Sequence, residues 1–522
     1  MVRRFVTEPR ERSSWRIKPP HDAQTQGLIV SAFPDLCWSE ALFLRIDAPG
    51  GAWLNLLQGP TAITNAQGQT AQAAAIGFTW TGLQKLGLGD KNTCASFAVP
   101  FQEGMHQEDR LRRLGDKLDG AWRDSVIEGG PLWSGDEPPQ AAGQTRPIAA
   151  GGGAKGQPRS APCTVHSILL LYDADRNAVA ERASKLSKAL AARNVITVRQ
   201  LSLDLRLDDG KVAREHFGFA DGLSQPIPYG DAIIRKDGRP AEKDPLHGVP
   251  AGEFLIGHLN AHHEKAPGPV VPADDRARDA ELTAEGAPEG FLNFGHNGSY
   301  MVVRELKQDV ASFWNSFEKG AQGITAGNAG ASHITASWLA ERAVGRSLDG
   351  DLLRPNGYLG PKDGRPDNDF GFFDSDRQGC GCPLGSHVRR TNPRDGLARD
   401  EAAASSALDA VNNHRILRRG RKFGSTIADR NKDDGEDRGL LFICLNTDIV
   451  RQFEFVQQTW LLNKNFGTLF DETDPLVGPK GPFTIPENPL RRIVEVDTFI
   501  QMAGGEYFFL PSIPALKYLA AS

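Results

Sequence analysis

The sequence has few cysteines, and their spacing argues against a disulfide-stapled fold. Six cysteines occur in 522 residues, too few to crosslink a chain of this length. Only Cys380 and Cys382 lie close together, in GCGCP, and no second pair stands at the spacing of a zinc site. Ordinary reduced thiols are therefore the favoured interpretation.

Long hydrophobic runs and a basic charge excess are also missing. The longest apolar runs, such as 168–171, are far shorter than the about 20 residues that span a bilayer. The basic start MVRRFVTEPRERSSW is not followed by an apolar segment, so we expect no signal peptide and a cytoplasmic location. The net charge of −5 and the pI near 6.2 disfavour nucleic-acid binding.

The remaining composition is that of a large globular protein. Hydrophobic residues make up 39% of the chain, which allows substantial cores, and the length predicts several domains or one two-part fold. Two polar stretches rich in glycine, proline and alanine, 137–162 and 261–290, interrupt the pattern. We expect both to be surface loops.

Strand–helix pairs occur near the start and near the end of the first half. Residues 41–46 (ALFLRI) predict a strand, with a short helix after it. Residues 165–172 (VHSILLLY) predict a buried strand, and Asp173 is placed to cap a helix over 174–193. A further strand is expected over 195–203.

The second half shows the same order of elements. Residues 299–305 (SYMVVRE) predict a strand, and Asp309 can cap the amphipathic helix that follows it. Residues 439–445 (GLLFICL) predict a buried strand, after which Asp448 begins a helix through about Leu462. This duplication predicts an α+β fold of two packed ferredoxin-like (split βαβ) halves, divided as 1–230 and 231–522.

A histidine stands among arginines in CPLGSHVRRTNPR, residues 382–394. The imidazole of His387 is a suitable axial ligand for haem iron. The nearby Arg389, Arg390 and Arg394 are of the type that pairs with haem propionates. The chain has 12 histidines, and one beside arginines is usually solvated or hydrogen-bonded, so both interpretations remain open.

An aspartate lies between glycines in GFADG, where Gly218 and Gly222 allow a tight turn close to a flat ligand. Asp221 can exchange protons beside a buried cofactor. An aspartate in such a turn is more commonly structural, with its side chain bonded to nearby backbone.

A basic segment, HRILRRGRKFG over 414–424, predicts a short strand and a glycine-rich bend. Strand alternation places Arg418 on the face of Ile416, which favours an inward direction for it, and places Arg415 and Arg419 on the opposite face. A guanidinium can stabilise a peroxide anion and a developing hydroxide. A solvated basic run, or a phosphate or propionate patch, is the alternative.

Taken in order, these segments resemble the dye-decolorizing haem peroxidases. The similarity lies in REHFGFADGLSQP (214–226), CPLGSHVRRTNPRD (382–395) and HRILRRGRKFG (414–424). It extends to QFEFVQQTW (452–460) and GGEYFFLPSIPAL (504–516), and so spans nearly the whole chain. The long loops resemble the larger, more elaborated members of the family.

This resemblance implies a cofactor and roles for five residues. His387 corresponds to the proximal ligand of haem b, with one non-covalent haem per chain, since the C-x-x-C-H attachment motif is absent. Asp221 corresponds to the distal acid/base and Arg418 to the distal arginine. Arg394 resembles an arginine that meets a propionate, and His216 resembles a histidine at the propionate edge.

The resemblance also implies a reaction and its partners. Hydrogen peroxide would oxidise organic donors such as dyes and phenolics by one-electron steps, without nucleic acid or membrane partners, in an unknown oligomeric state. Where some members carry an asparagine, two residues after the distal arginine, this chain has Gly420. The alternatives are a haem carrier or iron-releasing (deferrochelatase-like) protein of the same fold, and a relative that binds no haem.

Overall fold

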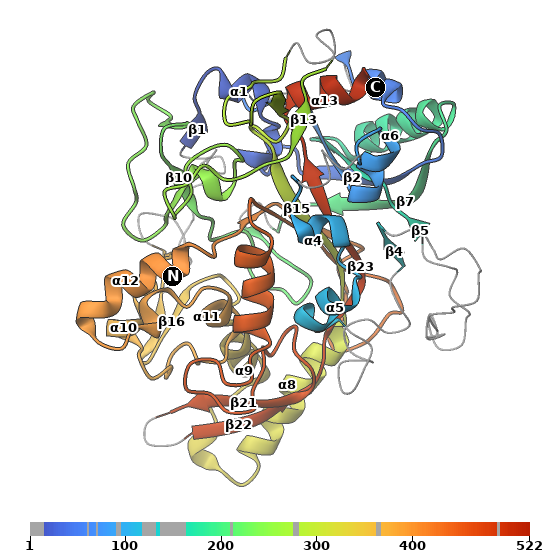
Figure 1. Ribbon diagram of the computed structural model, residues 1–522. Helices are drawn as coiled ribbons and strands as arrows, with labels where there is room; N and C mark the ends of the chain where they lie inside the picture. The colour runs from blue at the N-terminus through green and yellow to red at the C-terminus, as the bar shows by residue number, and fades with distance from the viewer. Residues whose placement is uncertain are drawn as a thin grey trace.

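One large sheet organises the part of the chain that the structure describes (Figure 1). This computed structural model describes residues 15–59, 62–68, 71–89, 96–116, 132–135, 163–208, 212–274, 281–361, 367–487 and 491–521. The predicted loop 137–162 lies outside these residues. The predicted loop 261–290 contains one short strand, β13 (Val270–Pro272), among turns and irregular segments where it is described.

The first half of the sheet has the strand order β7-β2-β6-β3. These strands are β2 (Trp38–Ile46), β3 (Gln72–Phe78), β6 (Ser167–Asp173) and β7 (Val195–Asp204), and all neighbours are antiparallel. The first and third strands are central, as in a ferredoxin-like sandwich. Helix α6 (Arg176–Ala191) follows β6 as predicted, and 3-10 helix η2 (Ala52–Leu56) follows β2.

The N-terminal cap of α6 differs from the prediction. The carboxylate of Asp175, rather than that of Asp173, accepts the N–H of Ala178 at 2.8 Å. Asp173 still belongs to β6, and its carboxylate accepts the N–H of Asp175 at 2.9 Å. The strand therefore continues one residue further than the pattern predicts, and the turn before the helix uses both aspartates.

The second half repeats this order as β23-β15-β20-β19. These strands are β15 (Ser299–Gln308), β19 (Arg421–Phe423), β20 (Gly439–Asn446) and β23 (Ile500–Leu510), and β18 (Leu417–Arg418) also pairs with β20. Asp309 caps α8 (Val310–Thr325) through the N–H of Ser312 at 2.9 Å, as predicted. The predicted duplication of two ferredoxin-like halves is confirmed. The boundary near residue 230 lies in the segment that joins β7 to β15 and stays a prediction.

The two halves join at both edges, so the sheet closes on itself. Strand β19 pairs with β7, and β23 pairs with β3 through Phe509 and Phe78. Alternate side chains of the strands fill the interior, for example Phe43, Leu170 and Phe508. The intervening side chains, such as Phe78, face outward and pack beneath α6 and other helices.

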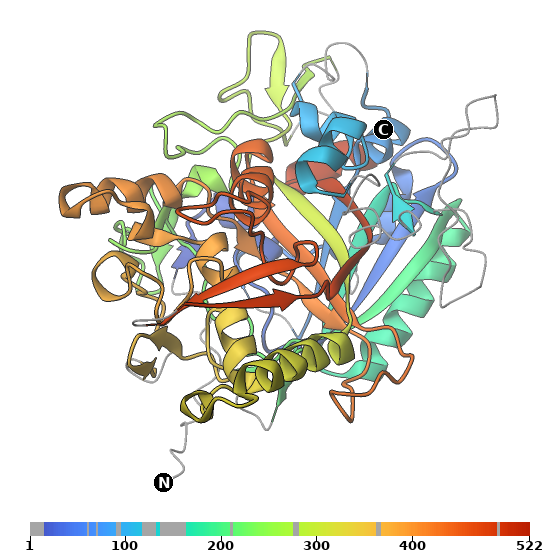
Figure 2. The ribbon, with the colours of Figure 1, turned by 90° about the horizontal axis from the view of Figure 1, so that it is seen from below.

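Helical layers cover the outside of this closed sheet. Figures 1 and 2 show α8 with α9 (Ala336–Val344) and the hairpin β21–β22 (Gly481–Pro486 and Arg491–Val496) on the side away from α6. The helix predicted after Asp448 is present as two π-helical segments, Val450–Glu454 and Val456–Leu461.

The remaining elements are short. The helices are α1 (His21–Gln24), η1 (Gly27–Ile29), α2 (Trp80–Lys85), α4 (Val99–Glu103), α5 (Glu108–Leu114), η6 (Ala251–Glu253), η7 (Ala329–Ala331), α10 (Phe372–Ser375), α11 (His387–Thr391), η8 (Arg394–Leu397), η9 (Glu401–Ala403), α12 (Ala404–Asn412) and α13 (Ile513–Ala520). The strands are β1 (Trp15–Ile17), β4 (Trp133–Ser134), β5 (Cys163–Thr164), β8 (Leu207–Asp208), β9 (Val212–Ala213), β10 (Ile227–Tyr229), β11 (Ile233–Arg235), β12 (Gly248–Pro250), β14 (Phe291–Asn293), β16 (Leu352–Arg354) and β17 (Gly357–Leu359). Among the described helices, none combines the length and apolarity that crossing a bilayer requires.

Candidate active site

His387 is the first residue of α11, and a buried carboxylate holds its imidazole. Nδ1 of His387 lies 2.9 Å from Oδ2 of Asp474. The Asp474 side chain is fully buried, whereas that of His387 is 30% exposed. A carboxylate accepts the Nδ1 proton, so the free lone pair is on Nε2. Within the described residues, Nε2 has no protein partner and is left to bind a ligand.

Two arginines beside His387 hold the helix in place rather than reaching for a ligand. Arg390 donates to the carbonyl oxygens of Trp460 at 2.8 Å and Glu472 at 2.7 Å. Arg389 donates to the carbonyl oxygens of Asp376 at 2.8 Å and Cys382 at 2.9 Å. Both side chains are buried, and their donors are already bonded. The interpretation that they pair with propionates therefore does not fit.

Asp474 is a candidate site residue that the sequence did not identify. Its Oδ1 accepts the N–H groups of Leu476 and Val477, each at 2.9 Å. Burial alone would raise the pKa of Asp474, but the His387 imidazole, the N–H of Val477 and the charge of Arg390 outweigh burial and lower it. The carboxylate therefore stays charged and fixes the orientation of His387. Asp474 lies 87 positions after His387, and no local motif links them.

The GFADG segment forms the predicted tight turn. Gly218 and Gly222 have φ values of 100° and 73°, where a side chain would be strained. The N–H of Asp221 donates to Ala213 O at 2.9 Å, and Asp221 Oδ1 accepts the N–H of Gly222 at 2.6 Å. The side chain of Asp221 is only partly buried, so its second carboxylate oxygen is accessible to a ligand.

The Glu215 carboxylate stabilises this turn through hydrogen bonds to its backbone. Its carboxylate accepts the N–H groups of Phe217 and Phe219, each at 2.8 Å, and an amide N–H of Gln308 at 2.6 Å. Burial raises the pKa of Glu215 to about 7, and the charge of Asp221 adds to the effect. Glu215 could not be recognised from the sequence, because a single glutamate before the motif has no distinctive spacing.

Arg418 belongs to β18 and reaches the loop that follows Asp221. Its Nη2 donates to the carbonyl oxygen of Ser224 at 3.0 Å, and its backbone N–H donates to Gln225 Oε1 at 3.0 Å. The predicted alternation is confirmed, since Leu417 is buried while Ile416 and Arg418 are partly exposed. The inward direction is wrong with respect to the closed sheet. Leu417 fills the interior, and Arg418 lies on the outer face.

The neighbouring arginines have structural roles. Arg419 donates to Leu28 O at 2.7 Å and Ile29 O at 2.6 Å, and Arg421 donates to Leu36 O at 2.7 Å. Both therefore anchor the N-terminal segment to the strand. At Gly420 a Cβ atom would lie 2.6 Å from Leu441 O, so this backbone excludes a side chain at that position. Of the arginines in this segment, Arg418 contacts Ser224, and the buried Arg415 lies near Arg418.

Arg394 and Arg418 both reach Ser224, and Arg346 and Arg415 are close enough to repel them. Arg394 approaches Ser224 Oγ through Nη2 at 3.4 Å and His247 Nδ1 through Nη1 at 3.0 Å, while its buried Nε has no partner in the described structure. Burial lowers the pKa of Arg394 and of Arg346 to about 10, and for Arg394 repulsion from Arg346 contributes. Burial, with Arg394 and Arg418, lowers the pKa of Arg415 well below its usual value.

This cluster fits an anionic ligand. Buried guanidinium groups that repel one another are stabilised when carboxylates pair with them. The two propionates of haem are such groups. The residues present therefore fit the propionates of haem, and the buried Nε of Arg394 is a donor without a partner in the described structure. The role of Arg394 at a propionate stays a prediction.

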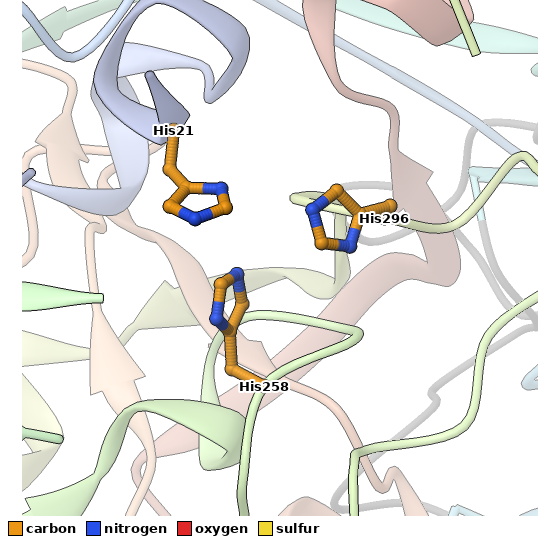
Figure 3. Close-up of side chains that lie close together, drawn as sticks. All are labelled: His21, His258 and His296. Carbon is orange, nitrogen blue, oxygen red and sulfur yellow. The ribbon is translucent and has the colours of Figure 1, made fainter. Parts of the chain in front are cut away.

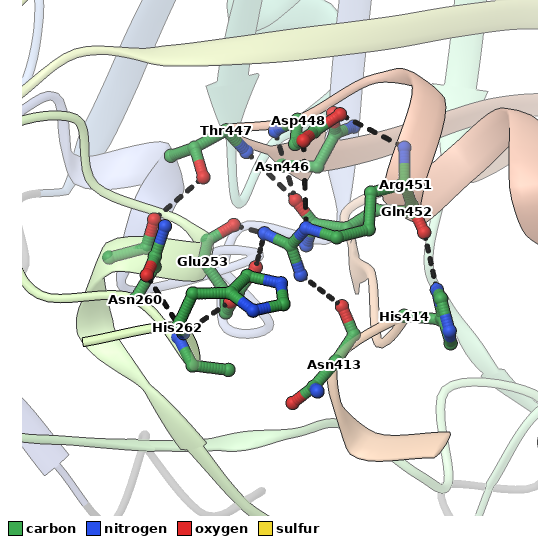
Figure 4. Close-up of polar contacts among 12 residues, drawn as sticks. Glu253, Asn260, His262, Asn413, His414, Asn446, Thr447, Asp448, Arg451 and Gln452 are labelled. Carbon is green, nitrogen blue, oxygen red and sulfur yellow. Dashed lines mark hydrogen bonds and ion pairs between the residues drawn. The ribbon is translucent and has the colours of Figure 1, made fainter. Parts of the chain in front are cut away.

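A polar network fixes the backbone of this arginine strand (Figure 4). The Gln452 side chain, from the first π-helical segment, donates to Arg415 O at 2.8 Å and to Glu253 O at 3.1 Å. The neighbouring Arg451 donates to the buried Glu253 carboxylate at 2.6 Å and to Asn413 O at 2.6 Å. The π-helical segment thereby holds the start of the strand that carries Arg418.

His216 does not contact this cluster in the described structure. Its Nε2 lies 2.7 Å from the carbonyl oxygen of Phe423, and the ring is buried. Burial lowers the pKa of His216 to about 4, so the imidazole is neutral and donates to that carbonyl. The contact joins the Asp221 turn to β19. A role of His216 at a propionate stays a prediction.

The fold has counterparts among solved structures. The DyP-type peroxidase of Anabaena sp. superposes with a TM-score of 0.65 at 22% identity, covering 92% of this chain and 91% of that one. A variant of the decolorizing peroxidase of Auricularia auricula-judae gives 0.68 at 21% identity, covering 96% and 99%. The chain thus has the duplicated α+β fold of these peroxidases.

Comparison with curated sequences identifies relatives as well as the fold. The chain is 30% identical over 374 residues to the multifunctional dye peroxidase DyP2 of Amycolatopsis sp., covering 68% of this chain and 71% of the relative. It is 26% identical over 381 residues to a dye-decolorizing peroxidase of Mycetinis scorodonius, covering 68% and 66%. No family model matches the sequence. The chain belongs to the dye-decolorizing peroxidase family and is an enzyme of the peroxidase class.

Proposed function

We propose that this peroxidase binds one non-covalent haem b on His387 and uses hydrogen peroxide to oxidise organic donors, dyes among them. The observation that carries the proposal is the His387–Asp474 pair. A buried carboxylate orients a partly exposed imidazole whose Nε2 has no protein partner in the described structure. The names of the relatives, which are dye peroxidases, support the donor class.

The residues around the proposed site divide the chemistry between them. When bound, haem supplies the iron at which peroxide is cleaved and two oxidising equivalents are stored. The Asp474 carboxylate makes the His387 imidazole a stronger electron donor through the bond to Nδ1. Arg394, with its unpartnered Nε, holds a propionate. His216 is proposed at the edge of the propionates, behind the Asp221 turn.

Asp221 and Arg418 act on the peroxide itself. Asp221, as carboxylate, accepts a proton from one peroxide oxygen and delivers it to the other, which leaves as water. Arg418 stabilises the negative charge that develops on the leaving oxygen as the O–O bond breaks heterolytically. Both are anchored to the same loop, since Arg418 bonds Ser224 three residues after Asp221. The organic donor then returns the two electrons one at a time.

The Arg418→Leu variant tests this division of roles. We expect it to retain haem and to react with hydrogen peroxide about 10²–10³-fold more slowly, because the leaving oxygen loses its cationic partner. Stopped-flow absorbance at the Soret band measures the reaction. Arg399→Leu is the matched control, since the Arg399 side chain is 90% exposed. A wild-type rate for Arg418→Leu would remove Arg418 from the mechanism.

The Asp474→Asn variant tests the proximal bond. Asparagine keeps the shape but removes the charge, so we expect the affinity for haem or the turnover to fall about 10–100-fold. Haem titration followed by absorbance, together with dye oxidation, gives both quantities. Asp471→Asn is the control in the same loop, because Asp471 is exposed and pairs with Lys464 at 2.7 Å. Equal behaviour of the two variants would argue against a role for Asp474.

Turnover separates peroxidase activity from the alternatives. The haem-supplemented enzyme should oxidise an anthraquinone dye only when hydrogen peroxide is present, at a rate proportional to its haem content. Protoporphyrin released without dye oxidation would instead indicate an iron-releasing protein. The cytoplasmic location stays a prediction.

A further inference from the structure

Three histidines from distant parts of the chain meet outside the residues assigned above (Figure 3). His21 begins α1, His258 lies in the turn after η6, and His296 lies between β14 and β15. One ring nitrogen of each histidine lies within 4.8 Å of a ring nitrogen of each of the other two. Figure 3 shows the three rings turned toward a common space.

Within the described residues, two of these rings are hydrogen-bonded and the third is not. Asn297 Oδ1 lies 2.7 Å from His258 Nε2, and Asn297 Nδ2 lies 3.1 Å from His21 Nδ1. Neither ring nitrogen of His296 is hydrogen-bonded to any described residue, although the side chain is partly buried. Three imidazoles at such distances, one of them without a hydrogen bond, are an incomplete polar cluster.

The cluster has the chemistry of a transition-metal site. Imidazole nitrogens from three separate segments of the chain converge within 4.8 Å, and imidazole is the commonest side-chain ligand of transition metals. Neutral imidazoles bind Zn²⁺ with bonds of about 2.0–2.1 Å. Tetrahedral geometry then places the nitrogens roughly 3.3 Å apart, so the rings need to move inward by at most about 1.5 Å.

We propose that His21, His258 and His296 bind one Zn²⁺ ion, with water in the fourth position. Three nitrogen ligands without a carboxylate select against Mg²⁺ and Ca²⁺, which prefer oxygen. Asn297 is buried, and its Oδ1 accepts from Nε2 of His258 at 2.7 Å, so it is placed to orient that ring from the second layer. The rings are partly exposed, and His296 also borders a cavity of about 60 Å³, so an ion can reach them.

A zinc ion here ties three segments together. It connects α1 to the turn after η6 and to the residues that lead directly into β15, one of the central strands of the second half. An ion that binds only the folded chain raises its stability by mass action. The expected effect is therefore a higher Tm, without a change in the haem spectrum.

Calorimetry on the haem-loaded, full-length enzyme tests the site. After treatment with EDTA and dialysis, titration with zinc chloride should show one equivalent with a Kd of about 1 µM or lower. His258→Ala and His296→Ala should each weaken this binding at least ~100-fold, since each removes one of three ligands. His262→Ala is the matched control, because His262 is exposed and lies four residues from His258. It should bind zinc like the wild type.

Wild-type affinity and stoichiometry in His258→Ala and His296→Ala would overturn the site and point to other ligands, such as Cys380 with Cys382. X-ray absorption at the zinc edge on the wild-type enzyme gives an answer that needs no variant. A shell of nitrogen or oxygen donors with the multiple-scattering pattern of imidazole supports the proposal. Sulfur in the shell, or no imidazole signature, contradicts it. The outcome is independent of the peroxidase assignment, because zinc binding is measured without peroxide.

Discussion

The His387→Ala variant is expected to lose most of its haem. Nε2 of His387 is the proposed iron ligand, and α11 offers no second imidazole to replace it, since the helix reads His-Val-Arg-Arg-Thr. We expect the affinity for haem to fall at least ~100-fold, because the iron then lacks its axial bond to the protein. The ratio of Soret absorbance to protein absorbance after haem supplementation and gel filtration measures this loss.

His333→Ala is the control for that variant. The His333 side chain is 51% exposed and pairs with Glu487 at the surface, so its loss should leave the haem content unchanged. Circular dichroism shows whether His387→Ala keeps its fold. Unchanged haem content and an unchanged Soret band in folded His387→Ala would refute the axial assignment.

Chemical rescue distinguishes a lost ligand from a damaged pocket. In His387→Gly the removed side chain leaves room beside Asp474, whose carboxylate remains held by the N–H groups of Leu476 and Val477. Added imidazole can bond Asp474 through one nitrogen and bind iron through the other. We expect it to restore the Soret band in His387→Gly. In His387→Gly/Asp474→Asn the same imidazole should restore it less well, because the orienting charge is gone.

The sequence predicted the parts of this molecule that local pattern determines. The strands around Leu170 and Ile443 were recognisable because they are buried on both faces and read as continuous apolar runs. The cap at Asp309 was recognisable because an aspartate directly precedes an amphipathic helix. The glycines at 218 and 222 predicted a turn, and both have positive φ in the structure.

Contacts between distant segments were beyond the sequence. Asp474 has no signal of its own, since it is one carboxylate on a loop and meets His387 through the packing of α11, where Arg390 donates to Glu472 O. The direction of Arg418 depends on the closure of the sheet, which makes Leu417 face the interior. The histidine cluster joins positions 21, 258 and 296, and no spacing rule connects them.

Asp221→Asn is expected to keep haem and to slow the reaction with hydrogen peroxide about 10²–10⁴-fold. The asparagine amide can still accept the N–H of Gly222, as Asp221 Oδ1 does at 2.6 Å, so the turn should persist. It cannot accept the peroxide proton, and this removes the general base. Stopped-flow absorbance under excess peroxide measures the rate. Asp231→Asn, at an exposed position, should react like the wild type.

If Asp221→Asn reacts with peroxide faster than expected, Glu215 is the residue to test next. It is the carboxylate next to the turn, and its pKa of about 7 makes it a possible substitute base. The charge of Asp221 raises the pKa of Glu215, so Asp221→Asn should lower it and increase the ionised fraction at neutral pH. If Glu215 takes over, the rate of Asp221→Asn should rise with pH through that lowered pKa, and adding Glu215→Gln should abolish the rise. A wild-type rate that survives both substitutions would show that neither carboxylate moves the proton.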